Sequence, residues 1–385
     1  MKTVRLRIAK DSVRPRVFKK MVRDADADTP NGSYVEVVDR DGAFVGRGLW
    51  NRRSTIPVRL LTRDPAARLD DDFLRRRVLD AVRLRRERLR LDEITDAYRL
   101  IHGEGDGVPG LVVDRFGGVL SAEVSLLAIY ERMAAIKEWL REAVGFEALV
   151  VREESRYAKI EGFRIPPPRP SADWRTTVRE HGARFRVDAA GAHKTGWFCD
   201  QRETRQALAA LARGRRVADL CCHAGGFAIH ALRAGARSAT LVDLDEVAAA
   251  SARANLEENG LAAEVIHADA FAFLRETPAG RFDAIVLDPP KFVRGIDERG
   301  GGLRRYADLN RLALERLDPG GLLLTCSCSG LVDEATFLDV VRRAAVDAGR
   351  RLRVLRLGGA PPDHPVDPEI PETRYLKTIL AEALT

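Results

Sequence analysis

Cysteine is scarce in this sequence, and its few copies do not form a regular framework. Five cysteines occur among 385 residues, an odd number without regular spacing. A disulfide-stabilised secreted fold is therefore excluded, and free thiols are expected. The two close groups, CCH at 221–223 and CSC at 326–328, lack the CxxC spacing typical of zinc sites. We therefore expect no metal.

Long apolar runs are also missing. No segment approaches the roughly 18 consecutive apolar residues of a membrane-spanning helix. The first ten residues, MKTVRLRIAK, have neither the apolar core nor the small-residue cleavage site of a secretory signal. The expectation is a cytoplasmic protein without a membrane segment. Its 45% hydrophobic and 31% charged residues are typical of a globular fold.

Charge of one sign is in only modest excess. Lys and Arg number 64 against 57 Asp and Glu, which gives a formal charge of +7 and a pI of about 9.3. An anionic partner such as nucleic acid fits this excess. Most of the cations are arginine in a chain rich in Ala and Leu, a bias that genomic base composition alone can produce. Charge by itself therefore leaves a merely solvated surface equally open.

Three regions differ in pattern. In residues 1–72, SYVEVVDRDGAFVGRGLW holds two alternating strands around Asp41-Gly42, which is a hairpin signal. Residues 73–172 are a predicted central α+β domain that opens with an amphipathic, arginine-rich helix and includes a helix from about Ala128 to Ala143. The proline-rich RIPPPRPS near its end is interpreted as a linker.

Residues 173–385 alternate strands with helices. The predicted strands are ARFRVDA, RRVADLCC, SATLVDLD, AEVIHAD, FDAIVLDPP and LLLTCSCS. This alternation predicts a parallel sheet covered on both faces by helices, a Rossmann-like α/β fold.

The strand ends carry the chemistry. Ligands of such sheets bind beyond the carboxyl ends of the strands. Four successive strand ends carry an acid and the fifth a thiol: Asp219, Asp243, Asp269, Asp288 and Cys328. Any single acid could be a helix cap, and we favour a cap for Asp245. The ordered set indicates a cofactor site. Gly225 and Gly226, at a helix N-terminus, would let a ligand approach the backbone closely.

This layout resembles the class I S-adenosylmethionine-dependent methyltransferases over the whole third region. The resemblance implies that Asp243 holds the ribose, Asp269 binds the adenine amino group, and the glycine turn faces the methionine half of the cofactor. The motif DPPKF would face the target base. The full set of implied cofactor contacts is Gln201, Asp219, Gly225, Gly226, Asp243, Asp269 and Asp288.

Further motifs resemble the ribosomal RNA large-subunit methyltransferase I group, which forms 5-methylcytosine in 23S rRNA. KTGWFCDQR, DLCCHAGGF, LDPPKF, SCSG and PDHPV…RYLK carry this resemblance in order, and DRDGAFVGRGLWN with IPVRLLTRD resembles the group's N-terminal PUA domain. Departures are Ala192-His193, Trp197 and the extra Cys326. The implied partner is 23S rRNA, and the implied substrate contacts are Arg202, Pro289, Pro290, Lys291 and Phe292.

Carbon 5 of cytosine is a poor nucleophile, but a thiolate added at C6 turns the ring into an enamine that can attack a methyl sulfonium. Such covalent catalysis needs an activated cysteine, and the matching family position is Cys328. Lys291 or the sulfonium itself would favour its thiolate. Asp288, protonated or sharing a proton with N3, would hydrogen-bond the N3 and amino edge. The base that removes the C5 proton is not identified.

The remaining thiols and histidines have simpler interpretations. Cys326 would point the same way as Cys328 one step deeper in the strand, where packing is favoured over catalysis. Cys221 and Cys222 follow a buried strand and are interpreted as packing residues. His193 and His223 are interpreted as pocket wall rather than as a general base.

Two other functions stay open. DPPK is similar to the NPPY and DPPY motifs that grip an exocyclic amine, which would fit N-methylation of a guanine. That reaction needs no nucleophile, so Cys328 discriminates against it. A non-catalytic RNA-binding assembly factor is the other alternative, and the intact acids and glycines argue against it. The sequence does not decide the target nucleotide, free rRNA against an assembled particle, or a monomer against a homodimer.

Overall fold

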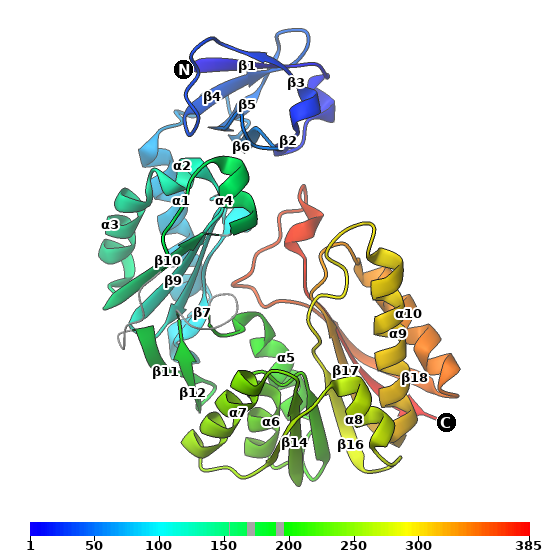
Figure 1. The fold of residues 1–385 in the computed structure, drawn as a ribbon. Coiled ribbons are helices and arrows are strands. Elements are labelled where there is room, and N and C mark those ends of the chain that lie inside the picture. The colour runs from blue at the N-terminus through cyan, green and yellow to red at the C-terminus, as the bar shows by residue number, and fades with distance from the viewer. Residues whose placement is uncertain (154, 168–173, 190–195) are drawn as a thin grey trace. The chain divides into compact units, whose positions relative to one another are not determined.

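A computed structural model describes residues 1–153, 155–167, 174–189 and 196–385 (Figure 1). His193 and part of the proline-rich segment lie outside these residues. The chain divides into two compact units: unit 1 is Met1–Thr176, Val187–Trp197 and Pro362–Thr373, and unit 2 is Thr177–Arg186, Phe198–Pro361 and Arg374–Thr385. No helix among the described residues is long and apolar enough to cross a membrane.

Unit 1 begins with a six-stranded sheet in the order β2-β6-β5-β4-β1-β3. Its core consists mainly of valines that alternate with more exposed residues along the strands. The predicted hairpin is confirmed, because β4 and β5 pair antiparallel and Gly42 between them has a φ of +86°. The strands are β1 (Lys2–Leu6), β2 (Arg16–Val17), β3 (Val22–Ala25), β4 (Tyr34–Val38), β5 (Phe44–Trp50) and β6 (Val58–Thr62).

The central part of unit 1 is a four-stranded sheet, β10-β9-β8-β7, packed against α1 and α3. The single helix predicted from about Ala128 to Ala143 is wrong: Arg132 (φ −99°, ψ 1°) leaves the helical conformation and pairs with Asp71 at 2.7 Å. Two helices result. The elements are α1 (Asp71–Arg83), β7 (Ala97–His102), β8 (Leu111–Phe116), β9 (Val119–Val124), α2 (Leu127–Tyr130), α3 (Met133–Val144), β10 (Ala148–Glu153) and α4 (Ser155–Glu161).

A strap, residues 362–373, returns from the end of the chain to unit 1. The fully buried Arg85 pairs with Asp106 (2.6 Å) and donates to the backbone carbonyl of Asp363 in the strap (2.6 Å). The Asp363 carboxylate accepts from the backbone N–H of Arg99 (3.0 Å). The acid of the PDHPV motif thus has a structural role within unit 1.

Unit 2 is built on a seven-stranded sheet in the order β15-β14-β13-β16-β17-β19-β18. The first five strands are parallel, as predicted, but β19 and β18 pair antiparallel and were not predicted. The largely exposed, arginine-rich β18 lacks the apolar run that marks a core strand. The strands are β13 (Arg216–Leu220), β14 (Ser238–Asp243), β15 (Glu264–His267), β16 (Phe282–Leu287), β17 (Leu317–Ser327), β18 (Arg351–Gly358) and β19 (Lys377–Leu384).

Helices cover both faces of this sheet (Figure 1). Ala218 and Leu220 of β13 share one core with side chains of α8, α9 and α10. Asp219 lies between them and points to the opposite face, where α6 donates a backbone N–H to its carboxylate (3.0 Å). The helices are α5 (Arg202–Ala209), α6 (Gly226–Arg233), α7 (Glu246–Glu258), α8 (Ala270–Glu276), α9 (Arg299–Arg316) and α10 (Glu334–Asp347).

A separate hairpin of β11 (Arg175–Glu180) and β12 (Ala183–Asp188) precedes the sheet. The strand predicted in ARFRVDA is therefore present, but outside the main sheet. Glu180 at the end of β11 is fully buried and receives two hydrogen bonds of 2.7 Å from Arg205 of α5 and one contact of 3.1 Å from His230 of α6. Burial raises the pKa of this carboxyl, but the Arg205 cation and both partners' hydrogen bonds outweigh it and hold the pKa well below its usual range.

Replacing Arg205 by Met should lower the free energy of unfolding by about 3–5 kcal/mol, because Glu180 would stay buried without its cation. Denaturant titration measures this loss. The matched control is Arg184→Met, which breaks an exposed ion pair with Glu258 (2.9 Å) and should change stability little. Equal losses in the two variants would show that the buried pair has no special role.

Candidate active site at the carboxyl edge of the sheet

The four predicted acids come together at the carboxyl edge of the unit 2 sheet. Asp219, Asp243 and Asp288 lie at or directly after the ends of β13, β14 and β16, and Asp269 follows β15. Cys221, in the turn after β13, is close enough to all four acids for them to affect the pKa of its thiol. Burial raises the pKa of its thiol, and the charges of all four carboxylates raise it further.

The turn between β13 and α6 has an unusual backbone. Cys221, His223 and Gly225 all have positive φ, at 58°, 49° and 78°. Glycine is required at the last position, because a Cβ there would lie 2.9 Å from a methyl carbon of Leu241. For the other two residues the conformation is strained, and such strain clusters at functional sites. This feature was not predicted, since the residue types do not reveal it.

Asp243 holds this turn in place. Its two oxygens accept from the backbone N–H groups of His223 (2.8 Å) and Asp245 (2.9 Å). Because a carboxylate oxygen can accept more than one hydrogen bond, ribose hydroxyls can still bind to it. The cap expected for Asp245 is confirmed by its bond from a backbone N–H of α7 (2.9 Å). Asp269 also caps a helix, α8, through one oxygen (3.0 Å), and its adenine contact stays a prediction.

Asp219 is the most deeply buried of the four acids, and one of its oxygens is open to a ligand. It is fully buried, and its Oδ1 has no hydrogen-bond partner among the described residues. Burial, followed by the charges of Asp288 and Asp243, raises its pKa to about 8, against the opposing effect of the bond from α6. A positive charge placed beside it would restore the ionised form. This edge of the sheet therefore suits a cationic ligand.

Gln201 reaches the same edge from the 3-10 turn Cys199–Gln201. It is 3% exposed and donates from Nε2 to Oδ2 of Asp288 (3.0 Å). The neighbouring Asp200 accepts from the hydroxyl of Tyr375, just before β19 (2.6 Å). Two predicted cofactor contacts, Gln201 and Asp288, therefore touch each other. Arg202 is only 1% exposed, and its predicted substrate contact stays a prediction.

Cys328 directly follows β17, and its thiol lies 4.0 Å from the carbonyl oxygen of Pro289. The candidate nucleophile and the DPPKF motif are thus neighbours. Cys326 is fully buried, and burial raises the pKa of its thiol well above the usual range. Both properties suit a packing residue.

A buried lysine that was not predicted from the sequence contacts the residues on either side of Cys328. Lys377, the first residue of β19, is 2% exposed and pairs with Ser327 across the β17–β19 ladder. Its Nζ donates to the carbonyl oxygens of Ser329 (2.6 Å) and Tyr375 (2.7 Å). Burial lowers its pKa to about 8. RYLK carried part of the family resemblance, but only the strand pairing shows where its lysine lies.

The other DPPKF residues divide between surface and core. Pro290 and Lys291 are exposed. Phe292 is 8% exposed and belongs to the core, with its ring centroid 4.8 Å from that of Tyr306 and the Arg305 guanidinium 4.1 Å above it. The predicted substrate contacts of this segment stay predictions, and for Phe292 the ring is already packed.

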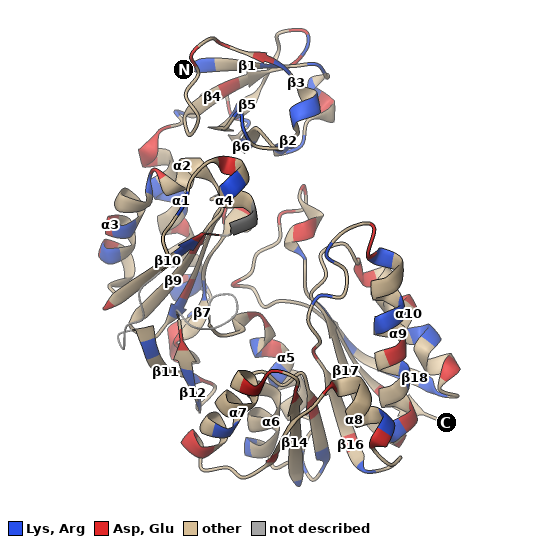
Figure 2. Ribbon diagram, in the orientation of Figure 1, with Lys and Arg blue, Asp and Glu red and all other residues tan. Residues whose placement is uncertain are grey.

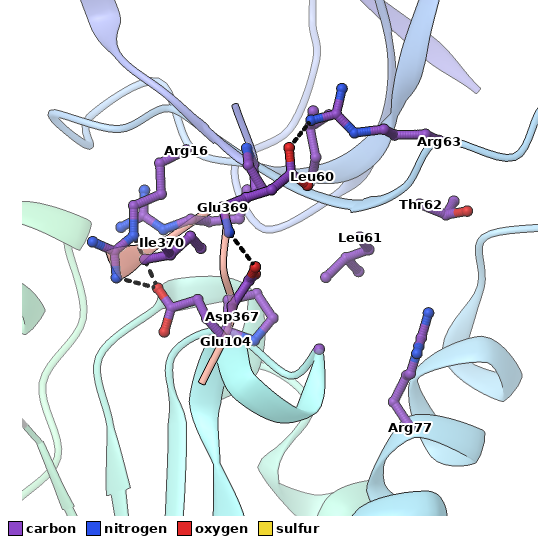
Figure 3. Close-up of a pocket in the computed structure, with 14 residues that line it drawn as sticks. Arg16, Leu60, Leu61, Thr62, Arg63, Arg77, Glu104, Asp367, Glu369 and Ile370 are labelled. Carbon is purple, nitrogen blue, oxygen red and sulfur yellow. Dashed lines mark hydrogen bonds and ion pairs between the residues drawn. The ribbon is translucent and has the colours of Figure 1, made fainter. Parts of the chain in front are cut away.

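A cavity of about 340 Å³ is lined by unit 1 residues alone (Figure 3). Arg16 and Arg63 line it but pair with Glu104 and Glu369, each at 2.8 Å. None of the predicted site residues lines this cavity, so it is not the candidate active site. Figure 2 shows Lys and Arg interleaved with Asp and Glu on the elements of both units.

A family model described as S-adenosylmethionine-dependent methyltransferase matches residues 123–380, more than half of the chain. The chain belongs to this family. Its cofactor is S-adenosylmethionine, which carries positive charge on its sulfonium and amino groups. A second model, of a PUA-like domain, matches residues 12–63 in the N-terminal sheet.

Named relatives match over almost the whole chain. Ribosomal RNA large subunit methyltransferase I of Photobacterium profundum is 36% identical over 377 residues, which cover 94% of each protein. The protein of the same name from Salmonella newport is 37% identical over 372 residues, 94% of this chain and 92% of its own.

Solved structures share the fold. A putative SAM-dependent methyltransferase from Streptococcus mutans aligns with a TM-score of 0.81 at 19% identity, covering 99% of this chain and 100% of its own. The putative methyltransferase SMU.776, complexed with SAH, also scores 0.81, at 20% identity over 98% of this chain and 100% of its own. The expected class, a PUA-like domain, a central domain and a Rossmann-like α/β methyltransferase domain, is confirmed.

Asp243→Ala should weaken S-adenosylmethionine binding about 100-fold, because it removes an acceptor for the ribose and releases the turn at His223. Isothermal calorimetry measures the affinity. Asp245→Ala is the matched control: it removes the cap of α7 and should lower stability but not affinity. Unchanged affinity in the Asp243 variant would remove this residue from the cofactor site.

Asp219→Asn should separate stability from cofactor binding. The raised pKa means that folded Asp219 keeps a proton which the unfolded chain loses, so this group lowers wild-type stability as pH rises from about 4 to 8. The difference in melting temperature between the ligand-free variant and the ligand-free wild type should therefore shift in favour of the variant as pH rises across that range. The affinity of the variant for the cofactor should fall at least tenfold. Parallel melting curves against pH would contradict the buried-acid interpretation.

Proposed function

We propose that this protein transfers a methyl group from S-adenosylmethionine to carbon 5 of a cytosine in 23S rRNA. The names of its full-length relatives support ribosomal RNA of the large subunit as the substrate class. The observation that carries the chemistry is the Cys328 thiol beside Pro289 at the carboxyl edge. N-methylation of a guanine, the alternative reaction, needs no nucleophile at that place.

The cofactor is proposed to lie along the ends of β13 to β16. Asp243 would accept from the ribose, Asp269 would bind the adenine amino group, and the turn at Gly225 and Gly226 would face the methionine half. The remaining contacts would come from Asp219, Gln201 and Asp288. When bound there, the cofactor supplies an electrophilic methyl group.

The chain's own residues would then activate the base. The Cys328 thiolate adds to C6, and Asp288 shares its proton with N3, so that the electrons displaced from the ring are held there while C5 becomes nucleophilic. Gln201 fixes the orientation of Asp288 through their 3.0 Å hydrogen bond. After methylation the C5 proton leaves, the C6–S bond breaks, and the thiolate is regenerated.

The RNA would be held partly by the PUA-like sheet of residues 1–72. Its arginines would contact phosphates, so affinity for rRNA should decrease as the salt concentration rises. The monomer or homodimer question stays open.

Cys328→Ala should abolish methyl transfer, because without a C6 adduct C5 has no electron pair to give. Cys326→Ala, which removes a fully buried thiol from the same strand, should keep most of the activity. Bisulfite sequencing of 23S rRNA from cells expressing each variant measures the product. Near-normal methylation by the Cys328 variant would contradict the mechanism and favour N-methylation.

A substrate RNA with 5-fluorocytidine at the target should trap the enzyme, because fluorine cannot leave as a cation and the adduct cannot resolve. A denaturing gel should show a protein–RNA complex that requires both the cofactor and Cys328. Peptide mapping should place the RNA on Cys328, and an adduct on Cys326 would sink the assignment.

A further inference from the structure

The surroundings of Cys328 pose an electrostatic problem. A thiolate is stabilised by positive charge, yet this edge of the sheet gathers carboxylates. Their effect is visible two residues earlier, where burial first and then the charge of Asp288 raise the pKa of Cys326. A nucleophile in this position therefore needs a cation close by.

Lys377 meets this need from the neighbouring strand. The antiparallel register places it opposite Ser327, one residue before Cys328, and its Nζ donates to the carbonyl of Ser329, one residue after. The ammonium therefore lies beside the Cys328 backbone. It uses two of its three N–H groups on the carbonyls of Ser329 and Tyr375, which leaves one for a further partner.

The burial of Lys377 makes its charge effective. The side chain is only 2% exposed, so solvent screens it little. Burial lowers its pKa to about 8, while a Cys328 thiolate raises it. By reciprocity, the same attraction favours the thiolate. Lys291, the cation suggested from sequence, is exposed and is more strongly screened.

We propose that the Lys377 ammonium activates Cys328 by forming a thiolate–ammonium pair once the Sγ proton has left to solvent. The thiolate then adds to C6 while the ammonium remains, and the pair is restored when the C6–S bond breaks. Lys377 thus acts through Cys328 rather than on the base itself. The use of this thiolate in catalysis rests on the function proposed above, but the pair itself does not.

Other titratable groups lie within electrostatic range of this pair, and they set the background against which Lys377 acts. Asp333 favours the charged lysine, and Lys291 and Arg374 oppose it. Tyr306 of α9 lies within electrostatic range of Cys328. Lys291→Met therefore tests the competing cation.

The test measures the rate at which iodoacetamide alkylates Cys328 between pH 5 and 10, in the full-length protein without RNA or cofactor. Mass spectrometry of the Cys328 peptide separates it from the other four thiols. In Lys377→Met and Lys377→Gln the midpoint of the profile should rise by at least one pH unit, and alkylation at pH 7 should fall about tenfold. Lys377→Gln keeps N–H donors without the charge, so the test stands even if Lys377→Met does not fold.

Two comparison variants show which cation sets the midpoint of the Cys328 alkylation profile. Lys377→Arg should restore the wild-type midpoint, and Lys291→Met should leave it within a few tenths of a unit. A midpoint unchanged in Lys377→Gln, or shifted instead by Lys291→Met, would overturn the proposal. Since no RNA is present, this outcome is separate from a failure to find 5-methylcytosine, which would overturn the proposed function and leave the pair intact.

Discussion

The antiparallel register between β17 and β19 is the constraint on which the candidate active site depends. A slip of one residue would turn every side chain of β19 to the opposite face of the sheet, and the Lys377 ammonium would lose its bond to the carbonyl of Ser329, the residue after Cys328. The register is well specified because most of β19 is buried. Through this pairing β19, a strand outside the parallel βα pattern, brings a cation to a sheet whose other strand ends carry acids.

The acids and the cation divide the site into two electrostatic parts. Around β13 and β14, Asp219 and Asp243 form a negatively charged part of the site, which a positively charged ligand such as the cofactor would stabilise. Around β17, Lys377 supplies positive charge to a thiol. Asp288, which accepts a hydrogen bond from Gln201, acts electrostatically on both parts, and the proposed function assigns it contacts with both the cofactor and the base. Burial of these groups makes each charge costly unless it has its partner.

Much of the fold was predictable because its signals are local. The alternation of strands and helices, the hairpin at Gly42 and the cap at Asp245 each depend on residues a few positions apart. The strand-end acids follow from a general property of parallel sheets. The break at Arg132, the two antiparallel strands and the place of Lys377 depend on partners far away in the chain, which periodicity does not report. The core position of Phe292 was not predictable either, because a side chain after a strand end can turn inward or outward and its packing partners are distant in the chain.

The strap has a consequence for synthesis. Arg85 and Arg99 lie in the first third of the chain, whereas the residue that satisfies them, Asp363, is among the last to be made. A ribosome produces the protein from its N-terminus, so the central sheet waits with an incomplete set of buried hydrogen bonds until nearly the whole polypeptide has emerged. A message that ends before the strap would yield a fragment in which neither unit is complete. The interleaved chain thus makes the folding of unit 1 dependent on synthesis of nearly all of unit 2.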